Sequence, residues 1–175
     1  IHDLIHQHHT MNRATTLDPL TYKFKQFGYK KVFKNAMQKS RKILVPSNYV
    51  QQCLISEWAV KSNKVLVTYE GVDDKIFTIA NKMKKENIKE VMDKFNIKPP
   101  YIYYVGNAHP HKNVEGLIQT FLNLKKQHRY LTLVLSGPDH YFWQRIKKEF
   151  YCQDIIYTGV ITDQELVALY KNAEC

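Results

Sequence analysis

The chain lacks a cysteine framework and any long apolar run. It has three cysteines among 175 residues, Cys53, Cys152 and Cys175, and no C-x-x-C pair. An odd count at wide spacing argues against structural disulfides and a cysteine zinc site, and it favours a reducing, cytoplasmic setting. No apolar run reaches the roughly 18 residues of a membrane-spanning helix. The chain begins at Ile1 without the layout of a signal peptide, so we expect a piece of a longer protein.

Glycine-rich phosphate motifs are also missing. The sequence contains neither G-x-G-x-x-G nor a Walker loop, so a dinucleotide-binding fingerprint and a P-loop ATPase are not indicated. The composition is 44% hydrophobic and 24% charged, which is typical of a globular protein. It excludes a disordered chain, a collagen and a coiled-coil rod. The length suffices for about one to one and a half domains.

Acidic residues are scarce in the first half of the chain. The formal net charge is +10, and residues 1–98 hold 18 Lys and Arg against 9 Asp and Glu. Between Asp18 and Glu57 there are eight basic residues and no acid. Such a one-signed field attracts phosphate, anionic lipid or nucleic acid. A solvated, lysine-rich helix face would give the same pattern, and both interpretations stay open.

Strand and helix signals alternate along the chain. Short apolar runs predict strands over 43–45, 64–69, 101–105, 131–135 and 155–157. Helical periodicity predicts helices over 20–42, 47–58, 81–98, 114–127, 139–150 and 163–175. Three successive strand–helix units in the second half indicate an α/β fold, with a parallel sheet and helices on both of its faces.

The sequence also predicts which residues cap these helices and which face the core. Ser47 and Thr162 are expected N-caps, and Glu165 would complete a capping box with Thr162. In the helix over 20–42 the candidate core positions are Phe24, Phe27, Phe33, Ala36 and Met37. In the helix over 114–127 they are Leu117, Ile118, Phe121, Leu122 and Leu124.

The candidate site is the loop that follows the strand over 101–105. Ligands of open parallel sheets bind beyond the carboxyl ends of the strands. His111 and Lys112 lie in this loop, beside a predicted helix N-terminus for which Asn113 is a plausible cap. Unpaired N–H groups and the helix dipole favour an anion there, and the Lys112 ammonium suits a diphosphate. Gly106 permits close approach of the backbone. An ordinary strand–helix loop with a surface lysine is the alternative.

Four histidines lie near the start: His2, His6, His8 and His9. His2 and His6 have the i, i+4 spacing of metal ligands on a helix. Their apolar neighbours favour a strand end that leads into a loop, so we expect no metal site. At a strand end, His2 could donate to a sugar hydroxyl or a leaving phosphate without a metal.

The segment from Tyr103 to Asn113 resembles the group 1 (family 4) glycosyltransferases of the GT-B fold, together with the Leu117-Ile118 and Phe121 positions after it. Other segments are similar to the same family in the same order and extend the resemblance over nearly the whole chain. They are Ile1-His2-Asp3-Leu4, Val45-Pro46-Ser47, Val67 to Asp73 with Phe77, and Gly159 to Asp163 with Glu165-Leu166 and Leu169-Tyr170.

This resemblance implies a GT-B fold of two Rossmann-like domains that face a cleft, both incomplete in this chain. Residues 1–75 would be the C-terminal part of the acceptor-side domain. Residues 76–175 would be the N-terminal part of the donor-binding domain. The family's pair of glutamates, separated by seven residues, would fall after residue 175, so we expect this chain alone to be inactive.

The activity implied is that of a retaining glycosyltransferase. It would move a hexose, mannose or glucose, from GDP- or UDP-hexose to a glycan or lipid-linked acceptor. The resemblance also implies that no metal or other cofactor takes part, and the nucleotide sugar is a substrate. We expect a cytoplasmic location, in which the basic helix over 20–42 contacts anionic lipid at the inner face of the membrane.

The resemblance also implies roles for individual residues. Lys112 would bind the donor diphosphate, and Gly106 would lie close to the phosphate or the sugar. His111 stands where the family usually has arginine, so a permanent bidentate charge is missing there. Asn113 completes the loop, and Val160 would frame the nucleotide base. In the first domain, His2 would contact the transferred sugar near the reaction centre.

The alternative function is a non-catalytic, basic α/β module that binds nucleic acid or another anion. The charge of the first half is its only support. No nucleic-acid motif accompanies that charge, and the phenylalanines of the helix over 20–42 have core-like spacing. Without such a motif we expect no nucleic-acid partner. Steep salt dependence of DNA or RNA binding would favour this alternative.

Overall fold

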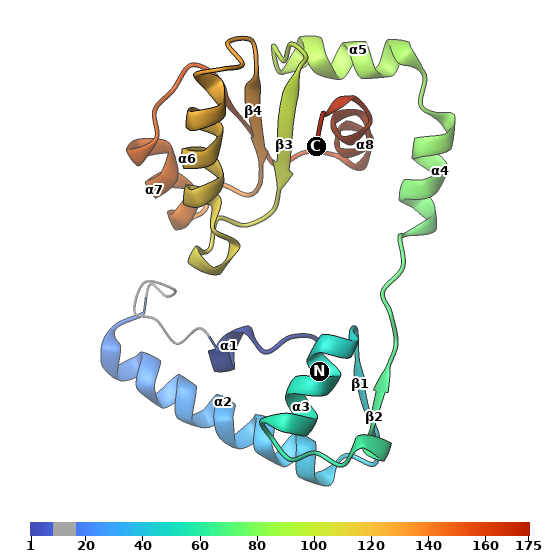
Figure 1. The fold of residues 1–175 in the computed structure, drawn as a ribbon, viewed down its shortest axis with the longest axis vertical. Coiled ribbons are helices and arrows are strands. Elements are labelled where there is room, and N and C mark those ends of the chain that lie inside the picture. The colour runs from blue at the N-terminus through green and yellow to red at the C-terminus, as the bar shows by residue number, and fades with distance from the viewer. Residues whose placement is uncertain (9–16) are drawn as a thin grey trace. The chain divides into compact units, whose positions relative to one another are not determined.

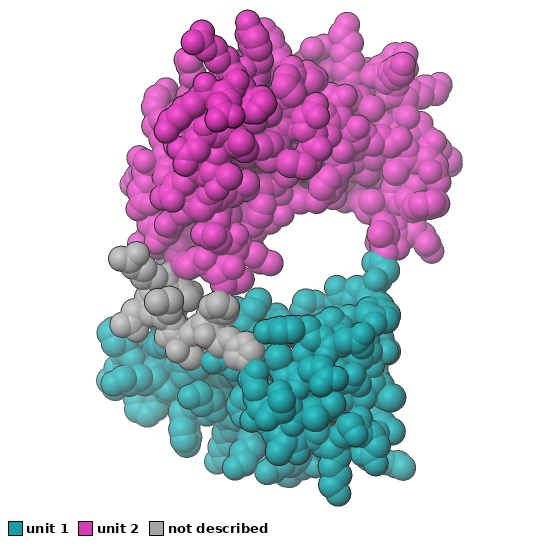
Figure 2. All heavy atoms as spheres, viewed as in Figure 1, with its two compact units in different colours: residues 1–71 teal, residues 72–175 magenta. Residues whose placement is uncertain are grey.

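The computed structural model describes residues 1–8 and 17–175. The chain divides into two compact units, residues 1–71 and residues 72–175 (Figure 2). This division falls slightly before the boundary expected after residue 75. Each unit has a hydrophobic core of its own.

The first unit is built on a pair of parallel strands. Ile43 pairs with Val65 and Val45 with Val67. Its elements in chain order are α1 (Ile5–His8), α2 (Pro19–Lys39), β1 (Ile43–Val45), α3 (Asn48–Ser56), η2 (Ser62–Lys64) and β2 (Val65–Val67) (Figure 1). As expected, the Ser47 hydroxyl caps α3 by accepting a hydrogen bond from the backbone N–H of Val50 at 3.2 Å.

Helix α2 uses only part of its apolar surface in the core of this unit. Phe33 and Met37 are buried, whereas Phe24 and Phe27 are both 70% exposed. The expectation that Phe24, Phe27 and Ala36 are core residues is therefore wrong. Phe24 precedes Phe33 by about two and a half helical turns, so the two side chains lie on opposite faces.

The second unit contains a three-stranded parallel sheet of order β3-β4-β5. In chain order its elements are α4 (Asp74–Lys82), α5 (Lys85–Lys94), β3 (Tyr101–Val105), η3 (Pro110–Lys112), α6 (Val114–Lys125), β4 (Thr132–Ser136), α7 (Tyr141–Glu149), β5 (Ile155–Gly159) and α8 (Asp163–Asn172). The helix expected over 81–98 is present as the shorter α5, whereas α4 was not expected. Two helices, α4 and α5, are separated by the extended residues Met83 and Lys84.

Helices cover both faces of this sheet, as the sequence predicts. Figure 1 shows α6 and α7 on one side and α8 on the other. Ile102 and Tyr104 of β3 pack with the cluster under α6 and α7, and Tyr101 and Tyr103 pack with α5 and α8. Within α6, Leu124 is 38% exposed rather than a core residue.

Helix α8 ends at Asn172 and not, as expected, at the chain end. The residues after it run along the free edge of β3. The N–H of Glu174 donates to the carbonyl of Tyr101 at 2.9 Å, and the N–H of Tyr103 donates to the carbonyl of Cys175 at 2.8 Å. Strand β3 therefore has hydrogen-bonded neighbours on both sides. Among the described residues, no helix is long and apolar enough to cross a membrane.

Candidate functional site

The path of the chain around β3 places the candidate site at the carboxyl end of that strand. From β3 the chain crosses one face through α6 to reach β4. From β5 it returns over the other face through α8 to the opposite edge of β3. In open α/β sheets, ligands bind where the connections diverge in this way. In this unit that point is the loop which begins at Gly106.

Glycines meet where the three strands end. The N–H of Gly106 donates to the carbonyl of Ser136 at 2.9 Å, and the N–H of Gly137 donates to the carbonyl of Gly159 at 3.0 Å. Gly106 and Gly159 have φ angles of 150° and 74°, where side chains are strained. A Cβ on Gly137 would lie 2.2 Å from the carbonyl oxygen of Gly106. The crossing of these backbones thus requires glycine.

The loop itself is held down at two apolar points. Ala108 and Val114 are 4% and 2% exposed and belong to the core under α6 and α7. Between them lies the 3-10 turn η3, followed by Asn113 in the left-handed conformation, with φ 52° and ψ 39°. Buried anchors at both ends fix the position of a polar loop segment.

Asn113 occupies the N-cap position of α6, but it does not cap that helix as expected. Within the described part of the chain, its side chain makes no capping hydrogen bond. It lies over Gly116, where an added Cβ would stand 2.6 Å from its Nδ2 atom. Asn113 therefore lies against the first turn of α6 without capping it.

His111 and Lys112 differ in how far they reach into solvent. The ring of His111 is half-buried and stacks on His109, with centroids 5.7 Å apart. The ring of His109 packs in turn against Phe142 of α7, at 4.8 Å. Lys112 is exposed. This arrangement leaves an ammonium group at the rim of the strand ends and a less mobile imidazole beside it.

Helix α6 carries an acid, Glu115, in its first turn. An unpaired carboxylate there would repel an anionic ligand at the same helix end. Arg145 of α7 pairs with the Glu115 carboxylate. Its guanidinium also lies 3.7 Å from Glu149. Arg145 therefore offsets the charge of Glu115, and the pair links α6 to α7.

Val160 follows the last strand end and is 77% exposed, so its segment borders the same edge of the sheet. Behind this edge, buried hydroxyls link the three strands. The Tyr103 hydroxyl donates to Ser136 at 3.1 Å, and the Ser136 hydroxyl lies 2.7 Å from that of Thr158. Burial raises the pKa of Tyr103 to about 12.

His2 lies in the first unit between two carboxylates. Its Nε2 atom is 2.9 Å from Glu70, and its Nδ1 atom is 3.4 Å from Asp3. The side chain is 74% exposed. The backbone N–H of Ile5 occupies the other oxygen of Asp3 at 3.0 Å. His2 is thus held at the surface with both ring nitrogens near acceptors.

His2 precedes the short helix α1, so His2 and His6 do not share one helix. His9 and the side chains of His6 and His8 lie outside the described residues. Among the side chains that the structure describes, no group of three or more His, Cys, Asp or Glu residues is placed to hold a metal ion.

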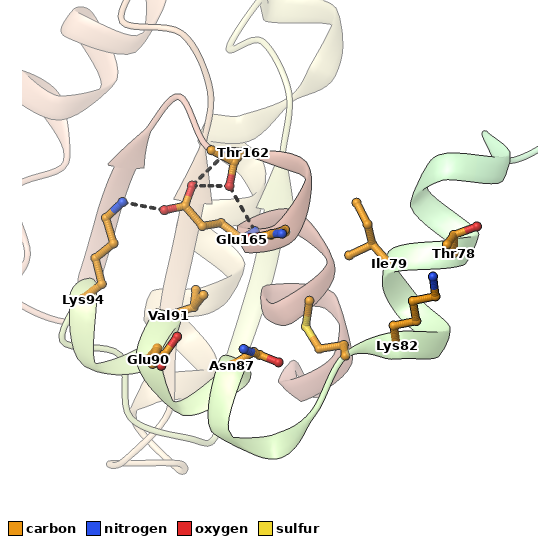
Figure 3. Close-up of a pocket in the computed structure, with 11 residues that line it drawn as sticks. Thr78, Ile79, Lys82, Asn87, Glu90, Val91, Lys94, Thr162 and Glu165 are labelled. Carbon is orange, nitrogen blue, oxygen red and sulfur yellow. Dashed lines mark hydrogen bonds and ion pairs between the residues drawn. The ribbon is translucent and has the colours of Figure 1, made fainter.

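A separate pocket of about 420 Å³ lies among α4, α5 and α8. Figure 3 shows Lys94 and Thr162 approaching the Glu165 carboxylate, which accepts from Lys94 at 2.5 Å and from the Thr162 N–H at 2.7 Å. The predicted capping box is therefore confirmed. Burial raises the pKa of Glu165, but these hydrogen bonds outweigh burial and leave the pKa below its usual 4.5. The predicted site residues are not among the 11 that line this pocket.

The structure thus brings Gly106, His111, Lys112 and Asn113 together in one loop, with Val160 on the same sheet edge. Sequence analysis did not identify the partners of these residues. Trp143 donates from its indole N–H to the carbonyl of Gly106 at 3.1 Å, and nothing local in the sequence indicates that bond. Glu70 comes directly after the predicted strand over 64–69, and a carboxylate beside a strand end is a possible partner for a histidine.

Comparison with known proteins identifies the family. The family model described as glycosyl transferases group 1 matches residues 75–175, which include the whole candidate loop. The chain belongs to the group 1 glycosyltransferases. This confirms the family that the sequence resembles.

Two curated relatives are mannosyltransferases from Escherichia coli. The O-antigen chain mannosyltransferase B is 34% identical over 79 residues, which are 42% of this chain and 20% of that protein. The serotype-specific mannosyltransferase WbdA is 27% identical over 155 residues, which are 85% of this chain and 18% of that protein. This group 1 chain therefore spans about a fifth of the length of these relatives.

A solved glycosyltransferase from Rickettsia africae ESF-5 has the same fold. The TM-score is 0.67 at 22% identity, over 83% of this chain and 40% of that one. The expected α/β fold class with parallel sheets is thereby confirmed, and the match is consistent with the GT-B type.

Proposed function

We propose that this group 1 glycosyltransferase transfers a hexose from a nucleoside-diphosphate sugar to a glycan or lipid-linked acceptor, with retention of the anomeric configuration. Mannose is the favoured sugar, because both curated relatives described above are mannosyltransferases. The donor is GDP- or UDP-hexose. The diphosphate is bound by protein groups without a metal ion, so transfer should continue in the presence of EDTA.

The observation that carries this proposal is the position of Lys112. It is an exposed cation on a loop anchored at Ala108 and Val114, at the point where the connections of the sheet diverge. Backbone N–H groups at a helix start add to the attraction for phosphate. Gly106 and Gly159 have no side chains, so a ligand can approach the backbone closely at these strand ends. In this site Lys112 and His111 bind the diphosphate, and the segment of Val160 borders the base.

His2 is assigned to the transferred sugar in the same proposal. Its imidazole lies between Asp3 and Glu70, and the contacts of these carboxylates with the two ring nitrogens orient the ring. A His2→Gln substitution should lower kcat of the full-length enzyme with little change in donor affinity. Proton NMR of the product anomeric centre tests retention.

The first experiment is calorimetric titration of UDP and GDP into the chain and into a Lys112→Ala variant. Loss of one charge-assisted contact should weaken binding roughly 10- to 100-fold. Lys126→Ala is the matched control, because Lys126 is also exposed but lies at the far end of α6 and bonds Asn123.

Each outcome bears on a different part of the proposal. Tighter binding of one nucleotide identifies the donor base. If the Lys112→Ala and Lys126→Ala variants have equal affinities for the nucleotide, the diphosphate does not bind at this loop. If the full-length enzyme, given GDP-mannose, UDP-glucose and related donors, neither hydrolyses nor transfers any sugar, the proposed activity is wrong.

A further inference from the structure

A chain of hydroxyl groups crosses the sheet of the second unit just behind its strand ends. The Tyr103 hydroxyl of β3 donates to Ser136 of β4 at 3.1 Å, and the Ser136 hydroxyl lies 2.7 Å from that of Thr158 of β5. The Thr158 hydroxyl donates to the carbonyl of Gly159 at 3.3 Å. Because a hydroxyl can donate one bond while it accepts another, a single direction satisfies all these bonds, from Tyr103 to Gly159.

The last link of this hydroxyl chain lies at an irregularity in β5. Leu135 pairs with Tyr157, but Ser136 pairs with Gly159, so Thr158 is an extra residue between two pairs of the ladder. This is the register shift of a β-bulge, which is rare between parallel strands and frequent beside active sites, where it re-aims a side chain. At this shift the Thr158 hydroxyl contacts Ser136, and the backbone enters the positive φ of 74° at Gly159.

The hydroxyl chain and the glycine backbones share the same residues. The carbonyl of Ser136 accepts from the N–H of Gly106 at 2.9 Å, and the carbonyl of Gly159 accepts from the N–H of Gly137 at 3.0 Å. Ser136 is fully buried, where a hydrogen bond is stronger, and its loss more costly, than in water. The position of Gly106 relative to Gly159 is therefore set by a side-chain path as well as a main-chain path.

This relative position matters for a ligand that contacts both strand ends. In the function proposed above, Gly106 lies beside the diphosphate and the segment of Val160 borders the base. A ligand with two contacts gains affinity over a ligand with one only when the two contact points have the separation that it needs. Inorganic pyrophosphate would use the phosphate contact alone. A disturbed separation should therefore weaken the nucleotide and spare pyrophosphate.

We propose that Tyr103, Ser136 and Thr158 are positioning residues of the donor site. Their hydroxyl chain fixes the separation between Gly106 and Val160 and so favours a nucleoside diphosphate over pyrophosphate. This inference rests on the function proposed above, and it does not require contact between the three hydroxyls and the donor. It predicts a change of ligand preference in addition to any loss of stability.

The test compares Tyr103→Phe with Tyr101→Phe. Tyr101 lies at the other end of β3, and its buried hydroxyl donates to the carbonyl of Leu169 at 2.7 Å. Each variant loses one buried hydroxyl bond, so both should lower the urea denaturation midpoint by similar amounts. In calorimetry, only Tyr103→Phe should lower the affinity for UDP or GDP, by roughly three- to tenfold, with the pyrophosphate affinity within about twofold of the parent chain.

Thr158 provides a second matched pair and a readout that needs no ligand. Thr158→Val removes the hydroxyl and should lose the preference for nucleotide, whereas Thr158→Ser keeps the hydroxyl and should retain it within about twofold. The backbone N–H groups of Gly106 and Gly137 should exchange with deuterium roughly threefold or more faster in Tyr103→Phe and Thr158→Val than in Tyr101→Phe, as followed by NMR.

Several results would overturn the inference. If Tyr103→Phe and Tyr101→Phe keep the parent's ratio of nucleotide to pyrophosphate affinity, the hydroxyl chain does not position the donor, and the donor site itself stands. Equal exchange of the two glycine N–H groups in these variants would mean that the hydroxyls do not hold the strand ends. A loss in Thr158→Ser as large as in Thr158→Val would assign the effect to packing. If the parent chain binds neither nucleotide, the proposed donor site fails and this inference fails with it.

Discussion

The indole N–H of Trp143 donates a hydrogen bond to the carbonyl oxygen of Gly106 at 3.1 Å. Trp143 belongs to α7, and Gly106 begins the loop after β3. Gly137 lies between them, because a Cβ at this position would approach both the Gly106 oxygen and the Trp143 nitrogen. The geometry of the candidate donor loop therefore depends on a side chain from a different strand–helix unit.

Trp143→Phe should lower the free energy of unfolding by about 1–3 kcal/mol, because the substitution removes the donor and leaves a gap in a 3% exposed position. Urea denaturation followed by circular dichroism measures this. Trp58→Phe is the control, because the buried Nε1 atom of Trp58 has no hydrogen-bond partner among the described residues. A Trp143→Phe loss no larger than the control's would mean that the bond to Gly106 contributes little.

Gly137→Ala should destabilise the second unit by more than about 2 kcal/mol, since the new Cβ would lie 2.2 Å from a backbone oxygen and 2.5 Å from Trp143. Gly28→Ala should stabilise the chain by about 0.5–1 kcal/mol, because Gly28 is inside α2 with nothing within 4 Å of the added carbon. Thermal denaturation of both variants checks the opposite signs. Similar shifts for the two would contradict the close approach at Gly137.

Glu165→Gln should cost about 0.5–1 kcal/mol at pH 7, because glutamine can keep the cap but loses the charge-assisted bond to Lys94. The pKa of Glu165 is lowered in the folded protein. Its stabilisation is therefore complete above the unfolded value near 4.5 and is lost as the pH falls through the folded value.

The measurement is urea denaturation of wild type and Glu165→Gln at a series of pH values from neutral to below the ordinary glutamate range. The difference between the two proteins should shrink as the pH falls. A constant difference would assign the effect of the substitution to packing rather than to the ionised carboxylate.

His111→Arg should tighten binding of the donor diphosphate, by roughly three- to tenfold, because arginine supplies a permanent charge and a bidentate donor. The half-buried ring of His111 already lies against His109, and a guanidinium can stack there in its place. Calorimetry with UDP and GDP checks this, with His128→Arg as the control on an exposed turn beyond α6. Unchanged affinity in His111→Arg would mean that this position does not contact phosphate.

Local signals were sufficient for much of the fold. The Ser47 cap, the Thr162–Glu165 capping box and the five strands are all present, since each depends on residues that are close in the sequence. Helix α4 was not predicted, and no glycine or proline at Met83 or Lys84 marks the boundary between α4 and α5. A helical pattern alone gave no reason to stop there.

The candidate loop could be located from the sequence, because the carboxyl ends of parallel strands must share one edge. Its internal geometry could not. Asn113 has the residue type of an N-cap, yet its left-handed backbone directs the side chain over Gly116. Similarly, both faces of α2 carry phenylalanine, and periodicity does not say which face meets the core.

The sequence by itself determined the order of the elements, the parallel α/β architecture, the family and the loop that carries Lys112. These follow from periodicity, caps and motifs, which act over a few residues. The tertiary structure alone decided that Trp143 holds Gly106, that Arg145 neutralises Glu115, that Glu70 lies beside His2 and that Phe24 and Phe27 face solvent. These relationships join residues distant in the chain or depend on which surface the core covers, and packing decides both.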